Sequence, residues 1–114
     1  MGFVTREEDG GKITVIEIPE RLTLESSGEL KDLLKELMEE KKYRIIMDLG
    51  QTKYVDSSGL GAIVSKIAMT RANGGDVRLA SVPQNIQELL ELTHLTQILR
   101  VFKSLNEAVQ SYNE

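Results

Sequence analysis

The stretch that decides the fold is YVDSSGLGAIV, residues 54–64. An apolar pair is followed by an acid, two adjacent serines and Gly-Leu-Gly, and then by a helical pattern. Asp, Ser and Gly are all favoured at helix N-termini, so the plainest interpretation is a strand that leads into a capped helix. One cap residue is enough for such an end. The second hydroxyl is therefore left over, and the question is what it does.

The helix that begins at Ser57 is expected to run to Ala72, because Asn-Gly-Gly follows and favours left-handed conformations. At 100° per residue, its large apolar residues gather on one side and form the natural core face: Leu60, Ile63, Val64 and Ile67. The opposite side carries mostly small side chains and little charge. It consists of Ala62, Ser65, Lys66 and Met69, with Gly59 and Gly61 near the helix start. We expect another protein to approach this second side closely. The ordinary alternative is that Met69 is one of the isolated apolar residues that are common on protein surfaces and has no role in binding.

The rest of the chain alternates strands and helices. Strands are predicted at 3–8, 12–18, 43–49, 76–82 and 97–102, and the other helices at 26–42, 83–93 and 104–114. Ser26 or Ser27 is expected to cap the first helix, with Glu29 at the capping-box spacing from Ser26. The order β-β-α-β-α-β-α-β-α predicts an α/β fold. We expect one domain, residues 1–114, with a mostly parallel or mixed five-stranded sheet and about four helices.

Composition excludes several classes of function. The 114 residues carry a net charge of −4, which does not suit a binder of nucleic-acid phosphates. The absence of cysteine rules out disulfides and thiolate metal sites, and His94 is the only histidine, so a catalytic base for Ser57 is not evident. No apolar run approaches the roughly 20 residues that span a bilayer. We expect a cytoplasmic monomer that binds no metal, nucleic acid or membrane and is not an enzyme.

An exposed hydroxyl at a helix N-terminus is a favourable place for a phosphate. The first backbone N–H groups of a helix lack partners, and the helix dipole favours negative charge there. In an α/β sheet, loops at the carboxyl ends of the strands tend to carry the functional groups, and VDSSG (55–59) lies in such a loop.

The segment YVDSSGLGAIVSKI (54–67) resembles the signature of the STAS domain, as in bacterial anti-sigma factor antagonists. The resemblance covers nearly the whole chain, including RIIMDLGQTKYVDSSGLGAIV (44–64) and the segment from Gly74 to Val109. It implies that the phosphate acceptor is the first hydroxyl after Asp56, which is Ser57. Ser58 is the alternative acceptor.

The resemblance also implies a cycle of partners. The unphosphorylated protein binds an anti-sigma factor that is a serine kinase, which frees a sigma factor; phosphorylation of Ser57 ends the binding, and a serine phosphatase reverses it. ATP and magnesium belong to the kinase, so this chain needs no cofactor. The expected contact residues are Thr23, Asp56, Ser57, Ser58, Gly59, Gly61, Ala62, Ser65 and Met69. The alternative is a STAS interaction module of another assembly, such as a stressosome-like or chemosensory scaffold or a transporter-associated domain.

One loop departs from the family pattern. Many relatives carry Gly-x-Leu-Asp after the second strand, whereas this chain has ERLT, residues 20–23, with Glu for Gly and Thr for Asp. The resemblance places this loop near the serine loop. The change leaves the fold expectation intact and bears on which kinase is recognised.

Overall fold

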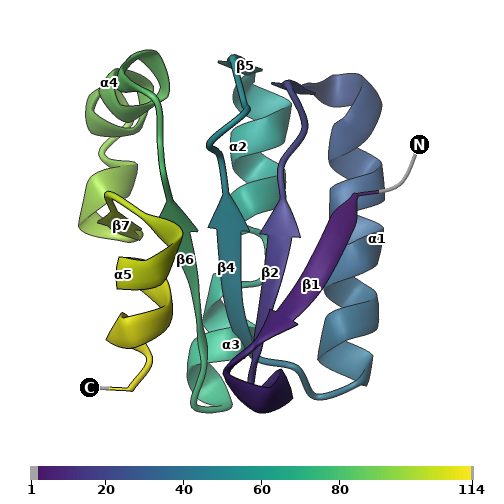
Figure 1. Ribbon diagram of the computed structural model, residues 1–114. Helices are drawn as coiled ribbons and strands as arrows, with labels where there is room; N and C mark the ends of the chain where they lie inside the picture. The colour runs from purple at the N-terminus through teal and green to yellow at the C-terminus, as the bar shows by residue number, and fades with distance from the viewer. Residues whose placement is uncertain (1–2, 114) are drawn as a thin grey trace.

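A mixed five-stranded sheet forms the centre of the structure, a computed structural model that describes residues 3–113 (Figure 1). The strand order is β1-β2-β4-β6-β7; β1 runs antiparallel to β2, and the other neighbours are parallel. The strands are β1 Val4–Glu8, β2 Ile13–Glu17, β4 Arg44–Asp48, β6 Asp76–Ala80 and β7 Arg100–Phe102. The predicted α/β fold with a mixed five-stranded sheet is confirmed.

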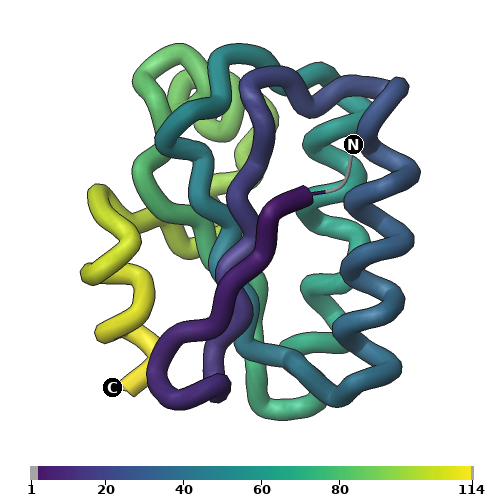
Figure 2. Tube along the Cα trace, turned by 45° about the vertical axis from the view of Figure 1, so that its right-hand side comes forward, coloured from purple at the N-terminus to yellow at the C-terminus, as the bar shows by residue number. Residues whose placement is uncertain are grey.

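Helices cover both faces of the sheet. Behind it in Figure 1 lie α1 and α2, with α3 below α2, while α5 lies in front. Figure 2 shows α1 and α2 side by side, and the two helices are in contact. The bounds are α1 Leu24–Glu39, α2 Ser57–Val64, α3 Ile67–Ala72, α4 Gln84–Leu92 and α5 Leu105–Ser111. None of the helices within residues 3–113 has the length and apolar character needed to cross a membrane.

The central strand β4 is covered on both sides, as its unbroken apolar run predicts. Ile45 and Met47 face the larger core, shared with α1, α2 and α4, while Ile46 faces the smaller core under α5. All three side chains are fully buried. The sheet is therefore rigidly packed at the strand whose carboxyl end leads to the serine loop.

The hairpin between β1 and β2 forms where Asp-Gly-Gly predicts it. A single 3₁₀ turn, η1 (Asp9–Gly11), joins the strands, and Gly10 and Gly11 have φ of 66° and 90°. Glycine adopts such left-handed values without steric cost.

The start of α1 was predicted wrongly. The helix begins at Leu24 with Thr23 as its N-cap, instead of after Ser26 or Ser27. The Ser26 Oγ accepts a hydrogen bond from the Thr23 N–H at 3.1 Å, and Ser27 is already inside the helix. Serines in the first turn bond to the backbone just as caps do, so the pattern was shifted by one turn.

The predicted helix 57–72 is interrupted. It divides into α2 and α3 at Ser65 and Lys66, where Lys66 has non-helical φ and ψ of −119° and 16°. The Ser65 N–H and Oγ both bond to the Ala62 carbonyl, at 3.2 and 2.8 Å. This tightened turn ends α2, and a serine that bonds back to the preceding turn bends helices in general.

The last strand and the last helix differ less from the prediction. Leu95–Gln97 form a 3₁₀ turn, η2, so β7 begins at Arg100 instead of residue 97. Ser104 caps α5 as predicted, because its Oγ accepts from the Glu107 N–H at 3.1 Å.

Candidate functional site

The candidate site lies at the carboxyl ends of the parallel strands, where the N-termini of α1 and α2 meet (Figure 1, top). Two short segments that sequence periodicity did not reveal, β3 (Arg21–Leu22) and β5 (Tyr54–Val55), pair there in parallel. The Asp56 N–H extends this pairing by donating to the Leu22 carbonyl at 3.2 Å. The expected neighbourhood of the ERLT loop and the serine loop is confirmed.

Asp56 caps both helices at once. Its Oδ1 accepts from the Gly59 N–H of α2 at 2.8 Å, and its Oδ2 accepts from the Leu24 N–H of α1 at 3.0 Å. A carboxylate is favoured at a helix N-terminus by the unpartnered N–H groups and by the dipole. The acid therefore does the capping, and the capping requires neither of the following serines.

Ser57 is the first residue of α2, and its side chain is exposed. Its Oγ makes no hydrogen bond to any residue within 3–113. Ser58 is half-buried and its hydroxyl is likewise unbonded within the described chain. Of the two, Ser57 is the more open to another protein, and its backbone N–H belongs to the unpartnered first turn of the helix.

The two glycines of the segment differ in role. A Cβ on Gly59 would lie 2.4 Å from the Leu22 carbonyl oxygen, so only glycine fits against β3. A Cβ on Gly61 would meet nothing within 4 Å, and Gly61 is exposed. The expectation that both lie open to a partner was wrong for Gly59, which is buried by close packing within the fold.

Ala62 was also assigned to the wrong side. It is fully buried in the larger core, and α2 packs against α1 as well as against the sheet. Four of the residues that remain exposed on α2 and α3 are spaced four positions apart, and we call them the Ser57 strip: Ser57, Gly61, Ser65 and Met69. Met69, on α3 beyond the break in the helix, is 46% exposed.

Exposed apolar residues flank Ser57, and sequence analysis did not single them out. Leu24 is 72% exposed beside Asp56, and Tyr54 is 46% exposed. The Arg21 guanidinium lies over the Tyr54 ring, 4.8 Å from its centroid. Leu24 is identifiable as a surface residue only once the start of α1 is known.

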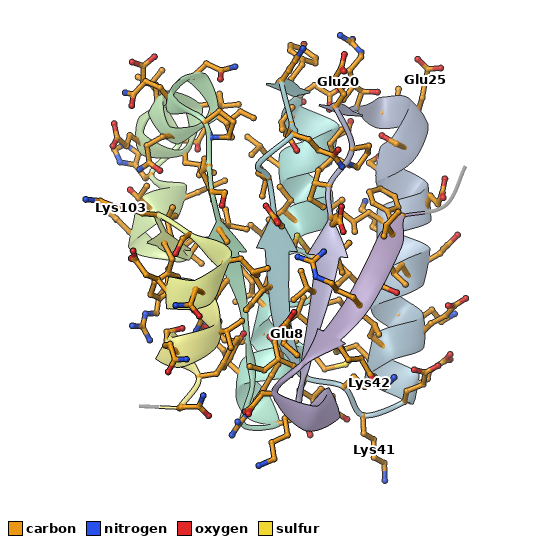
Figure 3. The ribbon with its side chains drawn as sticks, in the orientation of Figure 1. Glu8, Glu20, Glu25, Lys41, Lys42 and Lys103 are labelled. Atoms are coloured by element: carbon orange, nitrogen blue, oxygen red, sulfur yellow. The ribbon has the colours of Figure 1, made fainter. Side chains whose placement is uncertain are left out.

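The remaining predicted residues are placed as follows. Thr23 is half-buried as the N-cap of α1, and Lys66 is half-buried at the break between α2 and α3. His94 follows the C-terminal end of α4, whereas the N-terminal end of α4 approaches the site, where the Asn85 side chain donates to the Lys53 carbonyl at 3.0 Å. Figure 3 labels two acids at this same end, Glu20 and Glu25.

Comparison with known proteins gives a consistent result. The family model of the STAS domain matches residues 4–108. An anti-sigma F factor antagonist of Paenibacillus polymyxa is 28% identical over 90 residues, which cover 71% of this chain and 77% of that protein. A Thermotoga maritima protein, provisionally named an anti-sigma factor antagonist, is 28% identical over 67 residues, and the match spans only 59% of its length.

Solved structures share the fold. A crystal structure of an anti-sigma factor antagonist from Thermotoga maritima, also named provisionally, superposes with a TM-score of 0.89 at 23% identity, covering 98% of this chain and 95% of that one. The Bacillus cell fate determinant SpoIIAA in its phosphorylated form superposes with a TM-score of 0.75 at 15% identity, covering 96% and 98%.

Proposed function

Because the chain belongs to the STAS domain family, we propose that it is an anti-sigma factor antagonist regulated by phosphorylation of Ser57. In this proposal the unphosphorylated form binds an anti-sigma factor that is also a serine kinase, and a sigma factor is released. The kinase then phosphorylates Ser57 and the complex dissociates. A serine phosphatase restores the binding form. The names of the curated relatives support the antagonist role.

The observation that carries the proposal is the uncommitted Ser57 hydroxyl. It is exposed at the first position of α2, and Asp56 has already taken over the capping of that helix. A kinase therefore reaches the Oγ without unfolding the helix. In the free protein, the N–H groups of the first turn can stabilise the added phosphate.

The surface around Ser57 suits a protein partner. The Ser57 strip is narrow and carries small residues, with Leu24 and Tyr54 exposed beside its upper end. Aromatic and other large apolar side chains at the centre of an interface supply much of the binding energy. We place the kinase contact on this strip and on these two residues.

Electrostatics explains how one phosphate ends the binding. A phosphate adds about −1.5 to −2 charges. On Ser57 it lies next to Asp56 and inside the proposed interface, where it loses water and repels any facing acid. A loss of ~4 kcal/mol of binding energy weakens a complex about a thousandfold. No rearrangement of the fold is needed.

The chain acts in this proposal by binding and not by catalysis, as a monomer in the cytoplasm without nucleic acid or membrane. ATP and magnesium are bound by the kinase. His94 follows the C-terminal end of α4, whereas Asn85 near the N-terminal end of α4 bonds to the Lys53 carbonyl, which supports the proposal that His94 is not a base for Ser57. An esterase screen with Ser57→Ala as the control tests this: hydrolysis that disappears in the variant would contradict it.

The direct test uses partner capture. Immobilised wild type, Ser57→Ala and Ser57→Asp are exposed to lysate of the source cells, and the bound kinase is identified by mass spectrometry. We expect wild type to bind and to release the kinase on addition of ATP and magnesium. Ser57→Ala should bind but resist release, and Ser57→Asp should bind poorly. Ser58→Ala serves as the matched control and should behave like wild type.

Equal capture by wild type and Ser57→Asp would contradict the proposal. A scaffold protein captured equally by all four proteins, with no effect of ATP, would favour the alternative of a constitutive STAS interaction module.

A further inference from the structure

A groove lies between the outer edge of β1 and helix α1. It has a volume of about 350 Å³ and is lined mainly by β1 and by the outward side of α1, with Thr5, Glu7, Leu33 and Glu36 among the lining residues. β1 is the edge strand of the sheet and pairs only with β2 among residues 3–113, and Figure 1 shows it beside α1. The groove includes no residue of the Ser57 strip. It is therefore a second surface, separate from the candidate site.

The groove stays open because β1 turns polar side chains toward α1. Thr5 pairs with Ile16, whose side chain lies in the larger core, so Thr5 and Glu7 point to the same face of the sheet as α1. Both residues are exposed. Neither seals the apolar Leu33 of α1, which remains half-buried in the lining. The groove thus has a partly apolar floor beside an unpaired strand edge.

The backbone of β1 can accept another strand. In an antiparallel pair, alternate residues direct their N–H and C=O groups away from the neighbour, so an edge strand is a template for a further extended chain. Charges on an edge strand ordinarily protect it against such pairing. β1 carries Arg6, Glu7 and Glu8, but Arg6 bonds to Glu17 and Glu7 bonds to Lys42 at 3.0 Å, both within the fold. These ion pairs reduce the charge that the edge presents to another chain.

A strongly acidic stripe borders the groove on its α1 side. Glu25, Glu29, Asp32 and Glu36 are spaced four, three and four positions apart, so they lie on one exposed side of α1, and we call them the acidic stripe. None of them forms an ion pair with another residue of 3–113. Like charges at these spacings destabilise a helix, and only Glu25 lies in the first turn, where the dipole favours an acid. The stripe is an uncompensated negative surface, and its Glu36 lines the groove.

We propose that the groove binds an extended basic segment of a partner protein, which adds to β1 as a sixth strand of the sheet. The backbone of the segment pairs with the free edge of β1. Every second side chain of the segment then points toward α1, and lysine or arginine at these positions complements the acidic stripe. Their aliphatic stems cover Leu33 while their charged ends reach Asp32 and Glu36.

The same charges disfavour a second copy of this chain as the occupant. Antiparallel pairing of two β1 strands about a two-fold axis would place both α1 helices on the same face of the joined sheet. Each α1 contains five acids and two lysines, so most of the chain's net charge of −4 lies on this helix. The two acidic stripes would repel each other, whereas a basic segment is attracted.

The test is titration of the full chain with a short peptide of alternating lysine and valine, blocked at both ends, followed by calorimetry and by NMR of the backbone amides at low salt. Shifted amides should cluster at 3–8 and 32–37. We expect Asp32→Asn/Glu36→Gln to weaken binding at least about fivefold. The matched control is Glu88→Gln/Glu91→Gln, which makes the same change of net charge on the exposed side of α4 and should weaken binding less than about twofold.

N-methylated peptides test the strand pairing without changing the protein or the charge. One peptide is methylated at every lysine and the other at every valine. Because alternate residues of a paired strand direct their N–H groups at the neighbour, we expect one of the two peptides to lose binding and the other to keep it. Which of them loses binding shows whether the segment runs parallel or antiparallel to β1.

Three results would overturn the inference: equal weakening in both double variants, equal binding of both methylated peptides and the parent peptide, or no amide shifts along β1. Sedimentation of the chain alone covers the other occupant, because a dimer whose amide shifts map to β1 would assign the groove to a second copy. Ser57→Asp should bind the peptide as wild type does, so the outcome is independent of the proposed switch at Ser57.

Discussion

Asp56 determines the geometry of the candidate site at the scale of single residues. Its two carboxylate oxygens bond to the first turns of two different helices, at 2.8 and 3.0 Å. A serine at this position would offer one oxygen and would leave one helix end without its partner. This explains why the acid precedes two serines and why their hydroxyls remain available.

We predict that Asp56→Ala destabilises the protein substantially. A lost N-cap costs ~0.5–2 kcal/mol, and two helix ends lose a partner here, so the expected loss is about 1–4 kcal/mol in the free energy of unfolding in urea. Ser57→Ala is the matched control and should change stability by less than about 0.5 kcal/mol, because its Oγ makes no hydrogen bond within residues 3–113. Equal stability of the two variants would show that the double cap does not matter.

Replacing each of the two glycines of the segment by alanine should have opposite effects on the stability of the protein. Gly59→Ala places a Cβ 2.4 Å from the Leu22 carbonyl, so the backbone must shift, at a cost of about 1–3 kcal/mol. Gly61→Ala meets open space and should stabilise α2 by up to about 1 kcal/mol. Thermal unfolding of both variants measures this. A lower melting temperature for Gly61→Ala than for Gly59→Ala would refute the assignment of their roles.

Part of this detail is predictable from the sequence. The pattern DSSG predicted a helix start with a spare hydroxyl, because cap chemistry is local. It could not predict the bond from Asp56 to Leu24, since those residues are 32 positions apart and meet only through the fold.

At the scale of elements, a substitution at the N-terminus of α1 can change the affinity for a partner without changing the stability of the fold. Thr23 occupies the N-cap position of this helix, where the family pattern given by the resemblance has aspartate. Aspartate is at least as good an N-cap as threonine. We predict that Thr23→Asp changes the free energy of unfolding by less than about 0.5 kcal/mol. It should alter affinity for the captured kinase, because Thr23 precedes the exposed Leu24 beside Asp56. Unchanged affinity, measured by titration, would remove this loop from the interface.

The wrong assignment of Ala62 to the exposed side of the helix is also explained by how the elements pack. A helical wheel assigns one core face when a helix packs on one neighbour, whereas α2 packs on both the sheet and α1. The buried arc is therefore wider than the large apolar residues indicate. Small residues such as Ala62 and Gly59 lie at the close contacts, and their burial depends on neighbours that periodicity does not identify.

At the scale of the whole molecule, Tyr112 fastens α5 to the sheet. Its hydroxyl lies 2.7 Å from the carbonyl oxygens of Ile45 and Asp76 and accepts from the Ile45 N–H at 3.2 Å. The Arg78 guanidinium lies over the ring, 4.0 Å from its centroid. Burial raises the pKa of Tyr112 well above its ordinary value of 10, although the charge of Arg78 acts in the opposite direction.

This linkage predicts a pH dependence at the alkaline end. A group whose pKa is raised by folding contributes its full stabilisation below its unfolded pKa, near 10, and loses it as the pH rises further. The stability of the wild type should therefore fall faster above pH 10 than that of Tyr112→Phe, by up to about 1.4 kcal/mol per pH unit. Tyr43 and Tyr54 are present in both proteins, so their ionisation does not contribute to the difference between the two stability curves. Parallel curves between pH 9 and 11 would contradict the prediction.

The topology was the most predictable feature at this scale. Alternating strands and helices require right-handed crossovers and a parallel sheet, so the fold class followed from element order alone. The β3–β5 pair and the groove between β1 and α1 did not follow, because each is assembled from segments that meet only in the folded chain.

The most direct test of the central claim is phosphosite mapping of the protein isolated from its own cells, by intact mass and fragmentation under several growth conditions. We predict a single phosphate on Ser57, absent from Ser57→Ala expressed in the same cells. A phosphate on Ser58 would move the acceptor by one residue, and its loss in Ser58→Ala would confirm that correction. If no phosphate is found under any condition, the proposed switch is contradicted, and DSSG serves only to start a helix.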